Sequence, residues 1–595
     1  MADRFPLIID NSAEKIKELV SGDNLDLTKS NLKNADHIQS AGVNVAGVAT
    51  ATSLIGDGSQ LTNLPPSGGS LTATASGTLA DGSKVIINTD GTVSAVSQSA
   101  VGWVASLGSS GDDSSNDIEV DSSSNVHIVG RTASYSKGCV LQLNSSGVIQ
   151  WERNIGSSNS QYYNAVSTDS SGNVYTAGRT NASGQGGHDF LIAKYNSSGT
   201  EQWQITFGTN SPHTEEAWGI DVDSSGNVYV SGQYMISGTA YNGWAVAKFN
   251  SSGSLQWQRY LYSGSGDYAF KLAYSSQGDV YVCGQATAGQ GGDDAVVAKF
   301  DGSSGNLIWQ RGLGASSTQN WRNIAIDSSN NIYLIGSDGA NSKALVAKYN
   351  SSGTIQWQKH FGHGGWQSGF GIAIDSSDKI YISGTTDNNA GPGGGASSFM
   401  AKLDTSGNLE WQRSLGSTQS DGDNTQISVD DNHFYVTTRT ASGSQSGDNI
   451  LVAKLPVDGS GAGSYGDFTY AEESGMSMST SSLTAFTSSL SNGTPSLTRA
   501  TSSLTDAAGS MTSSSTNVTS INLTSENYIG VSNGAYSNGQ TATIQIMGAV
   551  DDAQSSLTPG QAYYVQGDGT LSETADSPSV FAGTAIAATK LIVRG

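Results

Sequence analysis

A segment centred on tryptophan recurs about every 50 residues, and it constrains the fold more than any other feature of the sequence. Intervals of 48 to 54 residues separate successive copies, which contain Gln-Trp-Gln or a variant of it. The tryptophans are Trp103, Trp151, Trp203, Trp257, Trp309, Trp357 and Trp411. Three further short apolar segments lie between neighbouring tryptophans, for example 324–327, 332–336 and 344–348. A repeat of this length with four short strands per unit is typical of a β-propeller.

The strand count predicts how the ring closes. Seven tryptophan strands are present, and seven strands of the Ile-x-Ile-Asp type begin near Ile118, Val166, Ile220, Leu272, Ile324, Ile372 and Ile427. The first tryptophan strand, 101–108, precedes every complete repeat, whereas the last repeat, 427–455, has none. We therefore predict an all-β chain in which residues 101–456 form a seven-bladed propeller of four-stranded blades, closed by the N-terminal strand. Such a ring leaves no open sheet edge.

The chain is acidic and poor in charged residues. Charged residues make up 13% of its 595 residues, and the formal net charge is −23. Because like charges repel, this balance argues against nucleic acid and against an anionic membrane surface as partners. No apolar run is long enough to span a membrane, and the first residues lack a secretory signal pattern. We expect synthesis in a reducing cytosol, with Cys139 and Cys283 as buried free thiols.

Two segments that flank the propeller share a β pattern. Residues 67–100 carry alternating strands around the turn Asp90-Gly91, and residues 526–595 contain further short apolar strands. An Asp-Gly pair between alternating strands is a good hairpin signal. Because the two ends of a propeller meet at one blade, we predict that the segments form one small C-terminal β domain with the propeller inserted between them.

A Ser/Thr-rich segment, 457–525, repeats one apolar residue every seven positions. The repeating residues are Met476, Leu483, Leu490, Leu497, Leu504, Met511 and Val518. A coiled coil needs a second apolar position per heptad, and Gly493, Pro495 and Gly509 would interrupt a helix. We predict an extended stalk, trimeric or of a repeat type; a helical bundle and a disordered segment remain the alternatives.

The sequence contains no recognised catalytic or metal-binding motif. Turns such as 169–173 and 196–199 use Asp or Asn to accept backbone N–H groups and Gly to supply a positive φ, and they lack the carboxylates of a calcium loop. His360 and His363 face opposite sides of a strand end. We therefore expect no enzyme, no metal and no cofactor, although a glycosidase pair of carboxylates drawn from different blades stays open.

One face of the predicted propeller is the better candidate for binding. Its second-to-third-strand loops and blade connections vary in length and carry aromatic residues, and binding usually lies on variable loops of a rigid scaffold. The candidate ligand-binding residues are Tyr162, His213, Tyr234, Tyr241, Tyr262, Tyr268 and Trp366. Another five aromatics precede their strands at regular positions, which predicts packing near the channel; they are Tyr163, Trp218, Phe270, Trp321 and Phe370. We expect the seven tryptophans of the recurring strand to pack between blades.

Residues 1–66 are too poor in apolar residues to fold alone and would need several copies wrapped together. Residues 4–10, 21–27 and 56–65 resemble the N-terminal region of tail-fibre-like structural proteins of marine cyanophages. The propeller sequence resembles the SBBP type of β-propeller repeat.

The first resemblance implies a homotrimer in the virion, made in the host cytoplasm and attached to other virion proteins. The residues that it implicates in attachment are Arg4, Phe5, Pro6, Leu7 and Asp10. The expected function is that of a tail fibre or similar appendage that presents the propeller to a host surface glycan or protein. A purely architectural role is the alternative, followed by a polysaccharide-degrading tailspike enzyme.

Overall fold

The computed structural model describes residues 70–593 except 133–136, 157–160, 182–186, 210–212, 236–240, 388–395, 443–446, 474–475, 489, 494–496, 502–505, 525 and 577. It also describes one short strand pair, β1 (Ile9–Asp10) with β2 (Lys15–Ile16). All regular elements in these residues are strands, so the chain is all-β as predicted. No helix in this part of the chain is long and apolar enough to cross a membrane.

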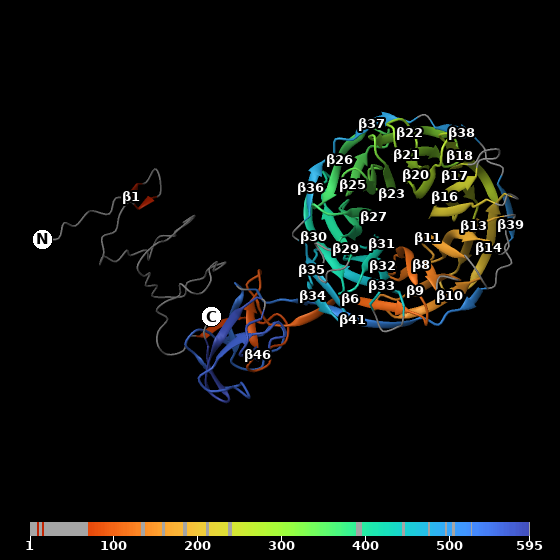
Figure 1. Cartoon of the computed structure of the whole chain (residues 1–595). Helices are drawn as coiled ribbons and strands as arrows, with labels where there is room; N and C mark the ends of the chain where they lie inside the picture. Colours follow the sequence, from red (N-terminus) through yellow and green to blue (C-terminus); the bar gives the residue numbers. More distant parts are fainter. Residues whose placement is uncertain are drawn as a thin grey trace.

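Six blades each contain four consecutive antiparallel strands, and the ring of blades is seen along its axis in Figure 1. Their strands are, blade by blade, β7 (Ser114–Val120), β8 (Val126–Thr132), β9 (Lys137–Leu143) and β10 (Ile149–Ile155); β11 (Tyr162–Thr168), β12 (Val174–Thr180), β13 (Asp189–Tyr195) and β14 (Glu201–Gly208); β15 (Glu216–Val222), β16 (Val228–Met235), β17 (Asn242–Phe249) and β18 (Leu255–Tyr262); β19 (Tyr268–Tyr274), β20 (Asp279–Ala286), β21 (Asp294–Asp301) and β22 (Leu307–Gly314); β23 (Gln319–Ile326), β24 (Ile332–Asp338), β25 (Lys343–Tyr349) and β26 (Ile355–Gly362); β27 (Gln367–Ile374), β28 (Ile380–Thr386), β29 (Ser397–Leu403) and β30 (Leu409–Gly416).

The seventh blade combines strands from both ends of the repeat region. It contains β31 (Asp421–Val429), β32 (His433–Thr440) and β33 (Asn449–Pro456), and β33 pairs with the earlier strand β6 (Gln98–Gly108). The register places Lys454 opposite Trp103 and Ile450 opposite Leu107. The fourth strand of this blade therefore comes from the N-terminal side of the propeller.

Each recurring tryptophan joins its own blade to the next one. Its indole Nε1 donates a hydrogen bond of 3.0–3.2 Å to a backbone carbonyl in the segment that follows the third strand of the next blade. The series includes Trp411 to Val457 and Trp103 to Ser145, so it runs through all seven blades. This confirms the predicted packing between blades.

A glycine in the same turn makes room for the indole. Gly199 has a φ of +71°, and a Cβ at this position would lie 2.5 Å from Cδ2 of Trp151. Asn196 Oδ1 accepts the backbone N–H groups of Ser198 at 3.0 Å and Thr200 at 2.9 Å. The Asn-Ser-Ser-Gly turn therefore connects the two strands of the hairpin and leaves space for the tryptophan ring of the preceding blade.

The predicted stalk is wrong, because its residues instead form a belt around the propeller. The belt, defined as residues 463–521, adds a fifth antiparallel strand outside every tryptophan strand. Its strands are β34 (Gly463–Tyr465), β35 (Phe468–Glu472), β36 (Ser477–Thr480), β37 (Thr484–Thr487), β38 (Ser491–Gly493), β39 (Thr498–Thr501), β40 (Asp506–Ala508) and β41 (Thr512–Ile521). They pair in turn with β30, β26, β22, β18, β14, β10 and β6, β34 pairing only with β35, so the belt runs opposite to the blade order (Figure 1).

The seven-residue period of the belt is the number of residues that it uses to pass one blade. The repeating side chains, none more than 8% exposed, enter the apolar cores between neighbouring blades; they are Met476, Leu483, Leu490, Leu497, Met511 and Val518. Leu504 lies outside the described residues. The belt needs only one buried side chain for each blade that it passes. This explains why the second apolar position of a coiled-coil heptad is missing.

The two flanking segments build one small domain, which is the pairing that their shared pattern predicts. One sheet has the order β3 (Ser70–Thr74), β43 (Thr541–Gln545), β42 (Tyr528–Ser532), β4 (Lys84–Ile87) and β5 (Val93–Ala95). The other has the order β44 (Val550–Asp551), β48 (Lys590–Val593), β47 (Val580–Ala587), β45 (Ala562–Val565) and β46 (Leu571–Ser572). Ile86 and Val96 share a core with Val565 and Leu591, so the N-terminal piece is integral to the domain.

Both cysteines are free and buried, as predicted. Burial raises the pKa of the Cys283 thiol to about 12 and also raises the pKa of Cys139. Neither thiol is therefore ionised at neutral pH, and both act as small apolar side chains in the blade cores.

Candidate binding site in the channel and on the variable face

The variable face of the propeller is the face that carries the second-to-third-strand loops and the blade connections. Of its predicted binding residues, Tyr241 and Trp366 are 50% and 49% exposed, and His213 is also exposed. Tyr262 and Tyr268 are half-buried, and the ring of Tyr268 stacks on Phe270 with centroids 6.3 Å apart. The seven candidates therefore do not form one exposed aromatic surface.

Trp366 stands on a loop that is fixed by hydrogen bonds. Its backbone N–H donates to Oδ2 of Asp387 at 2.9 Å, and the N–H of Asp387 donates to the carbonyl of Trp366 at 3.0 Å. His363 accepts the N–H of Gly365 at its Nδ1, and its Nε2 lies 3.1 Å from Oγ1 of Thr386. The exposed indole thus projects from a braced loop.

Tyr162 and Tyr234 are only 4% exposed, so the prediction that they bind a ligand on an open loop is wrong. Both belong to strands, β11 and β16, rather than to the loops beside them. The Tyr162 hydroxyl donates to Oε1 of Glu216 at 2.8 Å, and Arg131 and Arg179 lie 3.8 and 4.5 Å from its ring centroid. Burial is the main cause that raises the pKa of Tyr162.

A ring of side chains lines the central channel, and only Trp218, Phe270 and Phe370 of them were expected near it from the sequence. Every innermost strand has a β-bulge near its start, where the register shifts. The bulge residues that line the channel cavity, called the bulge ring here, are Asn116, Asn164, Trp218, Phe270 with Lys271, Arg322, Phe370 and Asn424. Together with Gln426 they line a channel cavity of about 50 Å³. A bulge re-aims a side chain that regular alternation would place elsewhere.

The bulge ring also divides the five aromatics that were predicted to pack near the channel. Trp218, Phe270 and Phe370 lie in bulges and line the cavity. Tyr163 and Trp321 precede their bulges and are fully buried in cores between blades. The sequence signal for most of the ring is its position two residues before the first apolar residue of each Ile-x-Ile-Asp strand, as for Asn164 before Val166.

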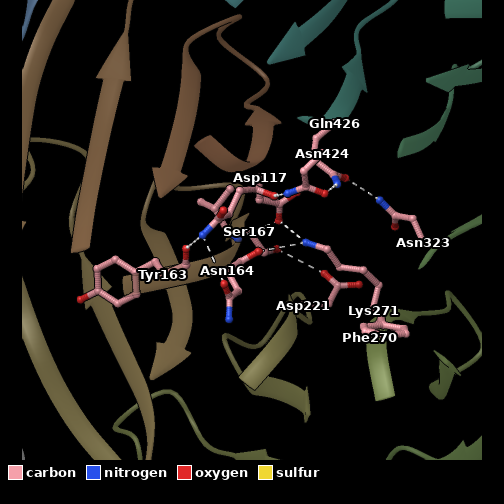
Figure 2. Close-up of polar contacts among 12 residues, drawn as sticks. Asp117, Tyr163, Asn164, Ser167, Asp221, Phe270, Lys271, Asn323, Asn424 and Gln426 are labelled. Atoms are coloured by element: carbon pink, nitrogen blue, oxygen red, sulfur yellow. Dashed lines mark hydrogen bonds and ion pairs between the residues drawn. The ribbon is translucent and has the colours of Figure 1, made fainter. Parts of the chain in front are cut away.

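An ion pair crosses the channel beneath the cavity. Lys271 of the fourth blade reaches Asp117 of the first, with Nζ 2.6 Å from Oδ2, as Figure 2 shows. Asp117 Oδ2 also accepts the N–H of Val166 at 2.9 Å, and Lys271 Nζ lies 3.4 Å from the carbonyl of Asn164. These contacts therefore link three blades, and the carboxylate of Asp117 neutralises the charge of Lys271.

Amide side chains form a bonded arc on one side of the cavity (Figure 2). Asn116 Nδ2 donates to the carbonyl of Tyr163 at 2.7 Å, and Asn424 Nδ2 donates to the carbonyl of Asn116 at 3.3 Å. Gln426 Nε2 donates to Oδ1 of Asn424 at 2.9 Å. These bonds hold the polar wall in place across the first, second and seventh blades.

A second pocket of about 200 Å³, the mouth pocket, lies between the seventh and first blades on the side of the variable face. Its lining residues are Ser114, Ser115, Asn116, Arg131, Asp423, Asn424 and Arg439. Asn116 and Asn424 line both pockets, so the mouth pocket adjoins the channel cavity. Arg439 Nη1 lies 2.9 Å from Oδ2 of Asp448.

Two carboxyls below the cavity have raised pKa values. Burial, with the nearby charges of Asp117 and Asp221, raises the pKa of Glu119 to about 8. Burial raises the pKa of Asp221 to about 6, against the hydrogen bond that it accepts from the N–H of Tyr274 at 2.7 Å. Among the described residues, no cluster of three or more His, Cys, Asp or Glu is arranged so that it could hold a metal ion.

Four of the five predicted attachment residues lie outside the described residues. Arg4, Phe5, Pro6 and Leu7 are not among the described residues, and Asp10 pairs with Lys15 in the short strand pair. Their proposed contact with other virion proteins stays a prediction.

Comparison with known proteins agrees with the fold. Residues 150–184 match the family described as SBBP, Beta-propeller repeat. This segment spans the outer strand of the first blade and the first two strands of the second. The match and the repeated four-stranded sheets identify a β-propeller-like protein. A search of curated proteins finds no match to the sequence.

Several solved structures are similar in outline. A protein of unknown function from Dyadobacter fermentans is 9% identical with a TM-score of 0.33, covering 60% of this chain and 99% of that one. The polysaccharide lyase Uly1 is 8% identical with a TM-score of 0.35, covering 58% and 90%. A GH43_1 enzyme from Xanthomonas citri is 11% identical with a TM-score of 0.23, covering 43% and 89%. At these scores the similarities carry no argument about activity.

Proposed function

We propose that this protein is a virion appendage protein of the tail-fibre type that recognises a host surface through the variable face of its propeller. The resemblance of residues 4–10 and 56–65 to cyanophage fibre proteins supports the virion setting. The observation that carries the recognition role is the exposure of Trp366 and Tyr241, about half each, on loops of one face.

Exposed aromatic rings of this kind suit a glycan or protein partner. Trp and Tyr combine a large apolar face with a polar edge, so they gain contact area without requiring a dry site. Trp366 is held by the Asp387 hydrogen bonds before any partner arrives. A fixed ring loses little conformational freedom on binding, which favours affinity.

Binding of the full chain to marine cyanobacterial cells and to their lipopolysaccharide tests the proposal. We expect the double variant Trp366→Ala with Tyr241→Ala to weaken binding by at least about tenfold, as loss of a central aromatic anchor does. Ile308→Ala is the matched control, because Ile308 is 50% exposed on the outer strand β22, away from the variable face.

Each outcome of this test separates the proposal from its alternatives. Equal binding by the double variant and the control contradicts recognition through these two residues. Absence of binding by the unmodified chain favours the architectural role. Release of reducing sugar from the lipopolysaccharide favours a degrading enzyme.

A further inference from the structure

Arg322 is a cation in the channel with no acceptor. Among the described residues, no carboxylate pairs with its guanidinium and no hydrogen bond is made by its Nε, which is buried. Its Cζ lies over the ring of Phe270, 4.4 Å from the ring centroid. The stack fixes its position and leaves its N–H groups available.

A second donor faces the same cavity. The indole Nε1 of Trp218 is buried and has no hydrogen-bond partner in the described residues, and Trp218 and Arg322 both line the channel cavity. Buried N–H groups are nearly always paired, because leaving one unpaired costs its full desolvation. Two such donors on one small cavity therefore indicate an acceptor that the chain itself does not supply.

The charge around the cavity favours an anion. No carboxylate lines the channel cavity, and its other cation, Lys271, is already paired with Asp117. In the mouth pocket Arg439 is paired with Asp448 at 2.9 Å and lies 3.7 Å from Asp423, so Arg131 is the cation that this pocket adds. The positive charges of Arg322 and Arg131, in a chain of net charge −23, would attract a negatively charged ligand.

We propose that the channel is a binding site for a carboxylate-bearing small molecule, whose carboxylate accepts hydrogen bonds from Arg322 and Trp218. Carboxylate geometry matches the donor fork of a guanidinium. The channel cavity has a volume of about 50 Å³. One water molecule needs roughly 10–15 Å³ of cavity volume, so the cavity is large enough for a carboxylate group. The mouth pocket of about 200 Å³ holds the remainder of a sugar-sized acid.

The site is independent of the proposed host recognition, since it uses neither Trp366 nor Tyr241. The shared chemistry is the carboxylate, and the ligand can be an acidic sugar or a simple organic acid. The amide arc presents side chains already fixed by bonds between blades.

Calorimetric titration of the full chain with glucuronate, acetate and glucose tests the site, with tryptophan fluorescence as a second readout. We expect glucuronate to bind and to change the emission of Trp218, while glucose, which lacks the carboxylate, binds at least about tenfold more weakly. Tighter binding of glucuronate than of acetate identifies an acidic sugar, and the reverse identifies a simple acid. Absence of binding by both acids, or equal binding of glucose, overturns the proposal.

Three variants assign the binding to the two donors. We expect Arg322→Gln to raise the dissociation constant for the bound acid by about 10–100-fold and Trp218→Phe, which removes the N–H and keeps an aromatic ring, by about 3–10-fold. Arg259→Gln is the control of equal charge change, because Arg259 bonds backbone carbonyls of Gln258 and Ser304 away from the channel. Equal affinity of Arg322→Gln, Trp218→Phe and Arg259→Gln contradicts the assignment, provided that thermal unfolding shows all three to be folded.

Discussion

At the scale of single residues, the side chain that follows five of the recurring tryptophans forms a hydrogen bond with the belt. Gln258, Gln310, Gln358 and Gln412 each donate from Nε2 to the carbonyl of the belt's repeating apolar residue, at 2.8–3.2 Å. In the first blade this position is Glu152, which instead accepts the N–H of Met511 at 2.8 Å. The side chain is thus matched to the group that the belt presents, and the Gln-Trp-Gln sequence serves two contacts with one strand.

Glu119 makes the stability of the propeller depend on pH. Its pKa is about 8 in the folded chain, above the usual value of 4.5, because burial and neighbouring carboxylates disfavour the charge. Between these values the folded state holds a proton that the unfolded state has released, so the free energy of unfolding must fall as pH rises. We expect Glu119→Gln to flatten this decline by up to about 1.4 kcal/mol per pH unit.

The measurement for Glu119 is chemical denaturation at intervals from pH 5 to pH 8, comparing the unmodified chain with the variant. Glu526→Gln is the control, because Glu526 is exposed and carries the same charge. A pH dependence that is identical in the Glu119 and Glu526 variants would contradict the expectation. Asp221, with a pKa of about 6, contributes in the same direction over a narrower range and remains in both variants.

At the scale of elements, the belt covers the outer edge of every tryptophan strand and becomes the outermost layer of each sheet. An outer strand without a neighbour presents unpaired N–H and C=O groups that invite pairing with another chain. Here each of the seven outer strands pairs with a belt strand, and β41 follows β6 from Gln98 to Gly108. Most exposed belt residues are Ser or Thr, with Glu472, Ala485 and Asn517 among the others, and polar side chains suit a strand with one face in water.

Leu483 tests how firmly the belt is held. Its side chain is 8% exposed and enters the core between the fourth and fifth blades. We expect Leu483→Ala to lower the free energy of unfolding by about 2–4 kcal/mol, through lost burial and the cavity left behind. Hydrogen exchange should show faster exchange in β36 and β37, with the inner strands of the same blades unchanged.

The control for the belt is Ser482→Ala, one residue away and exposed. It removes a polar side chain without opening a cavity, so the unfolding free energy should change by no more than about 0.5 kcal/mol. Equal exchange rates in the belts of both variants would show that the Leu483 side chain does not stabilise the belt.

Elements also show what the sequence could and could not predict. The blades follow from apolar periodicity and turn residues, which are local signals. The belt could not be predicted in this way, because one apolar residue in seven is compatible with a stalk as well as with a belt. Its partner strands also lie far away in the sequence. The bulge ring was missed because Asn116 or Arg322 interrupts strand alternation, and only the fold shows where a bulge points its side chain. Tyr162 and Tyr234 were misplaced because the strands extend further than the loops suggested.

At the scale of the whole molecule, the chain enters the propeller and leaves the belt at the seventh blade, next to the small domain. β6 closes the seventh blade, β41 returns beside it, and the segments that precede and follow them share the sheets of the C-terminal domain. The described residues of 70–593 thus build the cores of the blades and of the small domain.

Removal of residues 1–66 tests whether this segment makes the trimer. We expect the full chain to have three times the mass of the 61.2 kDa protomer in light scattering, and the shortened chain to be monomeric with unchanged thermal unfolding. The reason is that a segment too poor in apolar residues to fold alone gains stability only by packing against its copies. A full chain with the quadruple change of Arg4, Phe5, Leu7 and Asp10 to Ala is the control, because it alters the proposed attachment residues and keeps the rest of the segment. A trimeric shortened chain would place the interface in the propeller or the small domain, and a monomeric full chain would contradict the homotrimer itself.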